Sequence, residues 1–421
     1  MSRPDRLVAP ALGALWTNRA RLRFAWDVLR HGVCNDCSLG ASGLRDGTIP
    51  GNHLCDRRLR RLPRVTADAL DPARLADAAA LQRLDRAALR DLGRLGTPAI
   101  WRAGTRGFQP LEWTDATHLL ESRLRDSREG SAWSLLVDPS DVDLETLYQL
   151  RRTVGALERR AVDRAGLGLP PVVDLIVSAE ERRLRHRARQ RLGGWGSTAP
   201  LTQLGTGDPV AVLQIGRHPL LDDTIRALRH RGVLALRADP EQDWPTDVRH
   251  TLVYGQPGVL AALEVGLELA EEAPTAAALD RLSAVWIVGE LGASPVPAAG
   301  FRAHQAAFLE PAMLRAAGEA VLLLPTELPT EHVGGSSFVA DDGTVRFSPQ
   351  VLGHGIPGAA AGWEVAVRVL AHVDTDVASG LAAHDSQEIR DALARELPRF
   401  AGVAALGEPG VQAALGASAP G

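Results

Sequence analysis

Three cysteines near the start of the chain are the residues best suited to metal chemistry. Cys34 and Cys37 form a Cys-x2-Cys pair, Cys55 follows after 17 further residues, and the 421-residue sequence has no other cysteine. A Cys-x2-Cys turn can place two thiolates on one metal ion or on two corners of an iron–sulfur cluster. The pattern therefore predicts that Cys34, Cys37 and Cys55 bind a metal ion or a cluster.

Three thiolates are one ligand short of a four-coordinate zinc site or a complete cluster. The nearest candidate donors share no distinctive spacing; they are His31, Asp36, His53 and Asp56. Two other interpretations remain open: three unrelated free thiols, or a Cys-x2-Cys redox pair with an accidental third cysteine. The glycine-rich stretch between Cys37 and Cys55 predicts irregular backbone wrapped around a bound group.

Loops that follow apolar runs further along the chain suit a nucleotide or a phosphate. Glycine lets the backbone approach a ligand, arginine pairs with phosphate, and an acid can hold a ribose or a guanine edge. Each loop also has an ordinary interpretation as a turn, and the chain contains neither an intact dinucleotide fingerprint nor a Walker loop. The expected cofactor-binding residues are Gly216, Arg217, His218, Pro219, Asp239, Pro240, Gly289, Gly334 and Gly335. We expect His218 and His332, which lie on these loops, to be surface histidines.

The elements that position these residues are short apolar runs alternating with amphipathic helices. This pattern predicts an α/β fold with doubly wound parallel-sheet lobes, in which helices cover both faces of each sheet. The expected strands are Ala132–Val137, Val172–Val177, Val210–Ile215, Val233–Leu236, Val285–Val288 and Val321–Leu324. The expected domains are a small cysteine domain (1–65), a first lobe (66–272), a second, reduced lobe (273–405) and a flexible tail (406–421).

Composition narrows the class of protein. The net charge of -4 and the mixture of both signs give no reason to expect nucleic-acid binding, and all 47 basic residues are arginine. No stretch approaches the about 20 apolar residues of a membrane-spanning helix. We therefore expect a soluble, cytoplasmic protein with reduced thiols and no membrane insertion.

Taken in order, several segments resemble the molybdopterin oxidoreductase family, whose members carry a bis-molybdopterin guanine dinucleotide and include formate dehydrogenases. The resemblance covers most of residues 25 to 375. Besides the cysteine loop, the similar segments are Phe108–Ala116, Asp143–Leu150, Val210–Pro219, Gly232–Pro240, Leu322–Glu327, Glu331–Gly335, Arg346–Pro349 and Trp363–Glu364. The resemblance implies an N-terminal 4Fe-4S domain at the three cysteines and a molybdenum or tungsten pterin cofactor on the loops named above.

The chain departs from the family in three respects. It is shorter than the family's typical catalytic subunit, which implies that the C-terminal barrel is absent. No cysteine beyond Cys55 is present to bind the metal, so Ser140 and Asp141 are the candidates for that ligand. Arg57 and Arg58 stand near the last cysteine, where many relatives have a lysine between cluster and pterin.

Three functions follow as hypotheses. The first is a molybdopterin-dependent oxidoreductase-like subunit that passes electrons between a small substrate and a 4Fe-4S cluster, together with a partner redox subunit. The alternative is a degenerate, non-catalytic member that serves as an electron-relay or scaffold subunit without the pterin. The third is a zinc-stabilised binding module.

Overall fold

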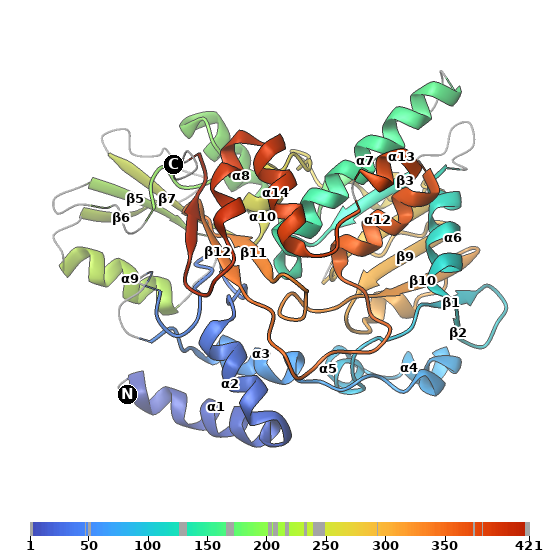
Figure 1. Ribbon diagram of the computed structural model, residues 1–421, viewed down its shortest axis with the longest axis horizontal. Coiled ribbons are helices and arrows are strands. Elements are labelled where there is room, and N and C mark those ends of the chain that lie inside the picture. Colours follow the sequence, from blue (N-terminus) through green and yellow to red (C-terminus); the bar gives the residue numbers. More distant parts are fainter. Residues whose placement is uncertain are drawn as a thin grey trace.

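A seven-stranded sheet forms the centre of the protein (Figure 1). The computed structural model describes residues 3–46, 48, 52–125, 133–165, 172–200, 204, 209–214, 219–230, 234–238, 249–292, 294–373, 375–380 and 382–416. The strands from β10 to β4 are parallel, whereas β1 is antiparallel to both neighbours. The sheet order is β2 (Gln109–Pro110), β1 (Ala99–Arg102), β10 (Ala320–Pro325), β9 (Phe301–Ala306), β8 (Ala284–Val288), β3 (Trp133–Val137) and β4 (Val172–Leu175).

Helices cover both faces of this sheet because alternate strand residues are apolar on both sides. On β10, Leu322 and Leu324 point into the core shared with α6 (Trp113–Arg125), α7 (Leu144–Ala165) and α12 (Gly362–Val373). Val321 and Leu323 point the other way, into a core that includes residues of η2 (Pro72–Ala76), α4 (Ala78–Leu81) and α5 (Arg86–Asp91). The observed architecture is a mixed α/β fold built on parallel sheet regions.

The order of the strands creates a switch point between β3 and β8. From β3 the chain passes through α7 to β4 at one edge, whereas β8, β9 and β10 follow one another towards the opposite edge. Loops that leave β3 and β8 therefore diverge at their carboxyl ends. In open α/β sheets this divergence forms a crevice where ligands bind.

Two smaller sheets flank the central one. The first is parallel, with the order β6 (Leu234–Ala238), β5 (Pro209–Gln214) and β7 (His250–Tyr254), and lies between α8 (Ala179–Leu192) and α9 (Pro219–His230). The second is antiparallel, with the order β11 (Ser336–Val339), β12 (Thr344–Ser348) and β13 (Gln412–Ala414). The other elements are η3 (Pro139–Asp141), α10 (Val259–Glu264), α11 (Ala276–Leu279), η5 (Pro311–Leu314), α13 (Thr375–Ser379), α14 (Ser386–Glu396) and η6 (Pro398–Ala405).

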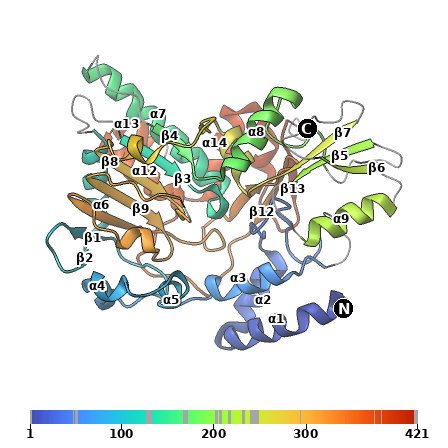
Figure 2. The same ribbon diagram turned by 180° about the vertical axis from the view of Figure 1, so that it is seen from behind.

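The N-terminal residues form a helical layer along one edge of the molecule (Figures 1 and 2). Its apolar residues form a separate small core that joins α2 and α3. None of the helices in the described part of the chain is long and apolar enough to cross a membrane. The helices of this layer are α1 (Arg3–Thr17), η1 (Arg19–Arg21), α2 (Leu22–His31) and α3 (Asp56–Val65).

All six strands expected from the sequence are present, each with ends within two residues of the expected ones. Strands β7, β9 and the whole antiparallel sheet were not expected. The apolar spacing of residues 258–271 predicts one amphipathic helix, but the observed helix is shorter. Helix α10 ends at Glu264, and Gly266 then turns the chain with a φ of +92°. The seven-stranded sheet takes strands from both sides of the domain boundary expected at residues 272–273, and β13 lies within the expected tail.

Candidate functional site

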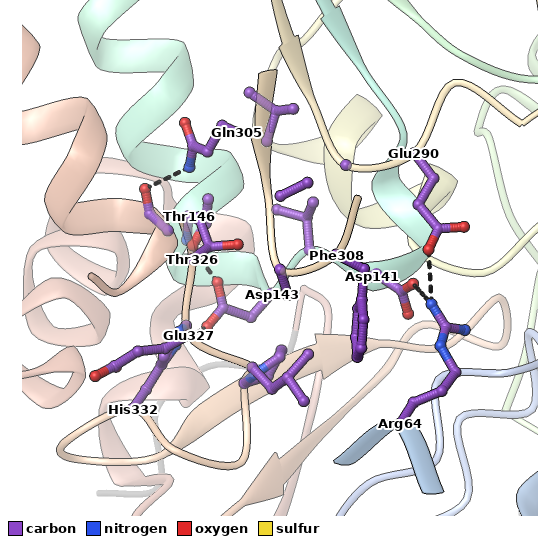
Figure 3. Close-up of a pocket in the computed structure, with 18 of the residues that line it drawn as sticks. Arg64, Asp141, Asp143, Thr146, Glu290, Gln305, Phe308, Thr326, Glu327 and His332 are labelled. Atoms are coloured by element: carbon purple, nitrogen blue, oxygen red, sulfur yellow. Dashed lines mark hydrogen bonds and ion pairs between the residues drawn. The ribbon is translucent and has the colours of Figure 1, made fainter. Parts of the chain in front are cut away.

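A cleft opens at the carboxyl ends of β3, β8, β9 and β10, at the switch point of the central sheet (Figure 3). It encloses about 690 Å³, part of which is continuous with solvent. The segments that line it follow these four strands; they include residues 141–143, 288–290, 305–308 and 326–329, with His332, Thr146, Gly362 and three residues of α3. Its concave shape and its place at the switch point make it the candidate ligand site of this fold.

A buried histidine and a buried aspartate meet on one wall of the cleft. His332 Nδ1 lies 2.7 Å from Asp143 Oδ2, and the two side chains are 2% and 0% exposed. Asp143 also begins α7, because its Oδ1 accepts a hydrogen bond from the Thr146 backbone N–H at 3.0 Å. Ser336 Oγ, at the start of β11, lies 2.9 Å from the same Oδ2. The aspartate therefore joins a helix start, a strand and the histidine ring.

Burial and neighbouring charges shift the pKa values of His332 and of Glu327, which also lines the cleft. Burial lowers the pKa of His332, but the carboxylate of Asp143 outweighs burial and the net pKa is raised. Burial raises the pKa of Glu327, and Glu331 and Glu364 add to this effect while His332 opposes it. His332 is thus favoured as the imidazolium, with Nδ1–H donating to Asp143.

The opposite wall consists of ion pairs, with Phe308 between the two walls (Figure 3). Arg64 Nη2 lies 2.7 Å from Glu290 Oε1 and 3.4 Å from Asp141 Oδ2, and Arg61 Nη2 lies 2.8 Å from Asp141 Oδ1. These contacts tie α3 of the N-terminal layer to loops after β3 and β8. Asp141, a candidate metal ligand, has both carboxylate oxygens in ion pairs, and Ser140 Oγ accepts a hydrogen bond from Gln256 Nε2 at 3.0 Å.

The expected cofactor-binding glycines divide into two groups. Gly289 lines the cleft; its φ is +85°, and a Cβ there would lie 2.8 Å from Asp138 O. Gly334 and Gly335 also have positive φ values, but the protein itself fills the space beside them, since a Cβ on Gly335 would lie 2.5 Å from the Phe347 ring. Gly216, Arg217, His218, Asp239 and Pro240 lie outside the described residues, and Pro219 begins α9.

The fold brings the three cysteines into one neighbourhood. Cys37 and Cys55 both pack against the apolar core beneath β5 and β7. Burial raises the pKa of the Cys37 thiol to about 12, with Cys34 and Cys55 close enough to raise it further. Cys34 and Cys37 lie on one turn, in which Cys34 N–H donates to Ala41 O and Gly40 N–H donates to Cys37 O. The three thiols therefore occupy one largely apolar site.

This site does not offer a complete ligand set. Within the described ranges, no three or more His, Cys, Asp or Glu side chains form a group that could hold a metal ion. Three of the expected fourth donors have ion-pair partners: His53 with Asp46, Asp36 with Arg61, and Asp56 with Arg60. His31 lines a groove between α2 and residues 349–353. No iron–sulfur domain is evident, and metal binding by Cys34, Cys37 and Cys55 stays a prediction.

Arg58 has a structural position in the cysteine loop. Its side chain is buried, and its guanidinium donates to the backbone carbonyls of Leu29, Gly32, Gly43 and His53. These four carbonyls come from the end of α2 and from the loop that leads to Cys55. Arg58 thus holds together the segments on both sides of the cysteine pair.

The N-terminal layer also exposes an unusual number of apolar side chains. Five of the eight large apolar side chains exposed among the described residues lie on α1 and α2: Leu12, Leu15, Trp16, Leu22 and Trp26. Trp16 is 71% exposed and Trp26 is 53% exposed. The spacing of three and four residues places each set on one helix face, opposite the buried Phe24, Val28 and Leu29. We call these five residues the α1–α2 face.

Charge is distributed unevenly along the chain. Residues 1–65 contain 12 arginines and five aspartates, a formal charge of +7, whereas the whole chain carries -4. The remaining residues therefore carry -11. The α1–α2 face lies on the basic part of the molecule, with Arg19 4.8 Å above the ring of Trp16.

Comparison with known proteins gives only weak likenesses, one of which is described here. No family model matches the chain, and no curated protein matches it. It is similar to one chain in the X-ray structure of the formyltransferase/hydrolase complex (FhcABCD) from Methylorubrum extorquens in complex with methylofuran. The match covers 68% of this chain and 100% of that chain, with 13% identity and a TM-score of 0.34. A likeness this weak supports no conclusion about fold or function.

These comparisons correct the expected membership of the molybdopterin oxidoreductase family, which is wrong. No family model matches the chain, that of the molybdopterin oxidoreductases included, and no curated protein of that family matches it either. The segments that carried the resemblance are short, and four of them consist of a strand followed by glycine or proline. Such strand–turn units recur throughout α/β folds, because glycine and proline are general turn residues. Their shared order was therefore weak support for a family.

The structure also reveals a site residue that the sequence analysis misjudged. His332 was expected at the surface, but it is 2% exposed and lines the cleft. The signal that favoured the surface was its place between Glu331 and a glycine turn. Glu331 is in fact buried in an ion pair with Arg94 at 2.5 Å. A loop whose polar residues are buried inside the protein cannot be distinguished from a surface loop by composition.

Proposed function

We propose that this chain is a non-catalytic scaffold subunit, without a pterin, that binds another protein chain through the α1–α2 face. The exposure of Trp16 and Trp26 on neighbouring helices carries this proposal. Exposed tryptophan and leucine side chains are costly in water, and tryptophan is among the residues that contribute most to binding energy at protein interfaces. The partner would cover these side chains.

The charge of the N-terminal residues specifies the partner further. The first 65 residues have a formal charge of +7, which favours a partner with acidic residues around an apolar groove. Arg19 over Trp16 and the neighbouring Arg23 would lie at the rim of such an interface. Opposite charges at a rim mainly increase the association rate and its dependence on salt.

The cleft supports the non-catalytic part of the proposal. The arginines of the cleft are engaged with acids of the protein: Arg61 with Asp141, and Arg64 with Asp141 and Glu290. Neither arginine is free to bind the phosphates of a dinucleotide.

The experiment isolates the tagged chain from its native cells and then rebuilds the complex from purified components. We expect a second protein in a fixed ratio, which binds again in vitro and dissociates with increasing salt. The Trp16→Ala/Trp26→Ala double variant should bind at least about 100-fold more weakly, because two anchors at the centre of an interface are lost. Val411→Ala, which changes an exposed apolar residue away from the α1–α2 face, is the control and should bind normally.

Three outcomes would overturn the proposal. Sedimentation of the purified chain could show a homo-oligomer that the double variant abolishes, in which case a second copy covers the face. Flotation with anionic vesicles, abolished by the same variant, would make the face a membrane contact. Unchanged affinity of the double variant for the partner would place the interface elsewhere.

A further inference from the structure

We propose that the cleft between the carboxyl ends of β3, β8, β9 and β10 binds a small uncharged ligand whose carbonyl oxygen accepts a hydrogen bond from His332 Nε2. This inference concerns a different surface from the α1–α2 face and does not depend on the proposed scaffold function. It rests on a buried, unpaired nitrogen that lines the cleft. It also rests on the charge balance around that nitrogen.

The geometry leaves only one ring nitrogen of His332 without a partner. Nδ1 lies 2.7 Å from Asp143 Oδ2, so the orientation of the ring is fixed. Nε2 is buried and has no hydrogen-bond partner within the protein, while His332 itself lines the cleft. A buried N–H without a partner costs free energy, and a ligand that accepts its hydrogen bond recovers this cost. The unpaired nitrogen therefore marks the polar end of a ligand.

The charges of the cleft determine that the ligand is uncharged. With His332 as an imidazolium, the lining side chains carry three positive groups (Arg61, Arg64, His332) and four acidic ones (Asp141, Asp143, Glu290, Glu327). Both arginines are held by acids, so an incoming carboxylate would find no free cation besides His332 and would lie near Glu327. An incoming ammonium would instead face the Nε2–H donor. A neutral acceptor avoids both penalties.

Apolar side chains form the rest of the cleft. Phe308 lies between the histidine wall and the ion-paired wall, and Val65 and Leu328 also line the space (Figure 3). A small amide or ketone with a short apolar group meets both requirements, because its oxygen reaches His332 while its carbon atoms contact Phe308. The ligand class is therefore a small carbonyl compound that carries no net charge.

The experiment follows the imidazole ring signals of the full-length protein by NMR while a neutral probe is added. N-Methylacetamide is the probe, and acetate and methylammonium are the charged comparisons. We expect saturable shifts of the His332 ring with N-methylacetamide, and at least about tenfold weaker binding of both charged compounds. The ring of His304, which is buried on β9 and does not line the cleft, is the internal control.

The His332→Gln variant assigns the signal and should bind the probe at least about tenfold more weakly. If this variant does not fold, the NMR titration of the wild-type protein with the three probes still tests the inference. Shifts confined to His332 that saturate with the neutral probe support the inference. Tighter binding of acetate or methylammonium, equal shifts of His304, or no saturation with any probe would overturn it.

Discussion

A histidine that donates one ring hydrogen to a buried carboxylate has one nitrogen left for a ligand, and His332 is in this position. At the scale of single residues, the loops after β3 and β10 thus combine unusual burial with charge. Several buried titratable side chains have shifted pKa values, and these shifts make the stability of the protein depend on pH.

Asp138, the first residue after β3, gives the clearest pH dependence. Burial raises its pKa from 3.8 to about 7, and the neighbouring Asp141 and Glu290 contribute. The folded protein therefore keeps a proton on Asp138 that the unfolded chain releases near pH 4. This contribution to stability is complete below that pH and is lost as the pH rises to about 7. Urea unfolding between pH 4 and 8 should show this loss in the wild-type protein.

The Asp138→Asn variant should lack that part of the pH dependence, since an amide does not titrate. Glu271→Gln, which removes one exposed carboxylate, is the control and should retain the wild-type slope. Equal slopes for the wild-type protein and Asp138→Asn would contradict the assigned pKa. The new amide keeps an oxygen in place of the Asp138 Oδ1 that accepts from the Ser140 N–H at 3.0 Å, so the loop should stay intact.

Substitutions of Cys37 distinguish cysteines that only pack against the apolar core from cysteines that bind a metal ion or cluster. Because Cys37 is partly buried against an apolar core, Cys37→Ser should lower the free energy of unfolding by about 1 kcal/mol, the low end of the cost of burying an unpaired hydroxyl. Cys37→Ala, which adds no polar atom, should cost less. The measurement is chemical denaturation of both variants, with elemental analysis of the wild-type protein.

The metal interpretation predicts a different result for the same proteins. About one zinc ion or one iron–sulfur cluster per chain, lost equally in Cys37→Ser and Cys37→Ala, would support Cys34, Cys37 and Cys55 as ligands. Chelation would then destabilise the wild-type protein as much as either substitution does.

At the scale of elements, the first turn of α7 connects most of the cleft. Asp143 and Glu145 flank Leu144 and reach different partners: His332 for the first, and Ser337 of β11 and Arg390 of α14 for the second. The start of one helix therefore fixes the loop that carries His332 and the antiparallel sheet beside it.

Replacing Arg390 should show how much its ion pair with Glu145 contributes to the free energy of unfolding. Glu145 and Arg390 are both 0% exposed and lie 2.7 Å apart, so Arg390→Met leaves a buried carboxylate without its cation. The expected cost is about 3–5 kcal/mol in unfolding free energy. Arg368→Met breaks a half-exposed pair with Glu364 on α12 and should cost no more than about 0.5 kcal/mol. Similar costs for the two variants would contradict this account.

The sequence predicts some of these elements well and others poorly, for physical reasons. Strands β3, β8 and β10 are continuous apolar runs, which a buried parallel strand requires. Strand β9 is equally central, but Arg302, His304 and Gln305 interrupt its pattern. The structure buries all three: the guanidinium of Arg302 donates to backbone carbonyls, and burial lowers the pKa of His304 to about 3. Polar residues that the tertiary fold buries hide a strand from any local pattern.

The candidate site was predictable only in part. Gly289 was correctly expected on a strand-end loop, and the structure places it in the cleft. Asp143 and His332 are 189 residues apart, and no local spacing links them. Their meeting depends on the order of the strands, which places the loop after β3 beside the loop after β10. The resemblance to a known family could not predict that Asp143 and His332 meet, because the resemblance depended on common turn residues.

At the scale of the whole molecule, the cleft and the α1–α2 face are two separate surfaces. The cleft is at the switch point of the central sheet, whereas α1 lies along the outer edge of the N-terminal layer (Figures 1 and 2). The basic N-terminal residues and the acidic remainder give the molecule a charge asymmetry, since residues 1–65 carry +7 and the rest carry -11. This asymmetry should orient a charged partner before contact.

The measurement that tests the scaffold proposal most directly is the dissociation constant of the rebuilt complex for the wild-type chain and for Trp16→Ala/Trp26→Ala. The account predicts a 1:1 or other fixed-ratio complex that weakens at least about 100-fold in the double variant and also weakens with salt. Circular dichroism of the double variant should match that of the wild-type protein, because both tryptophans are exposed. An unchanged dissociation constant for a correctly folded double variant would contradict the account.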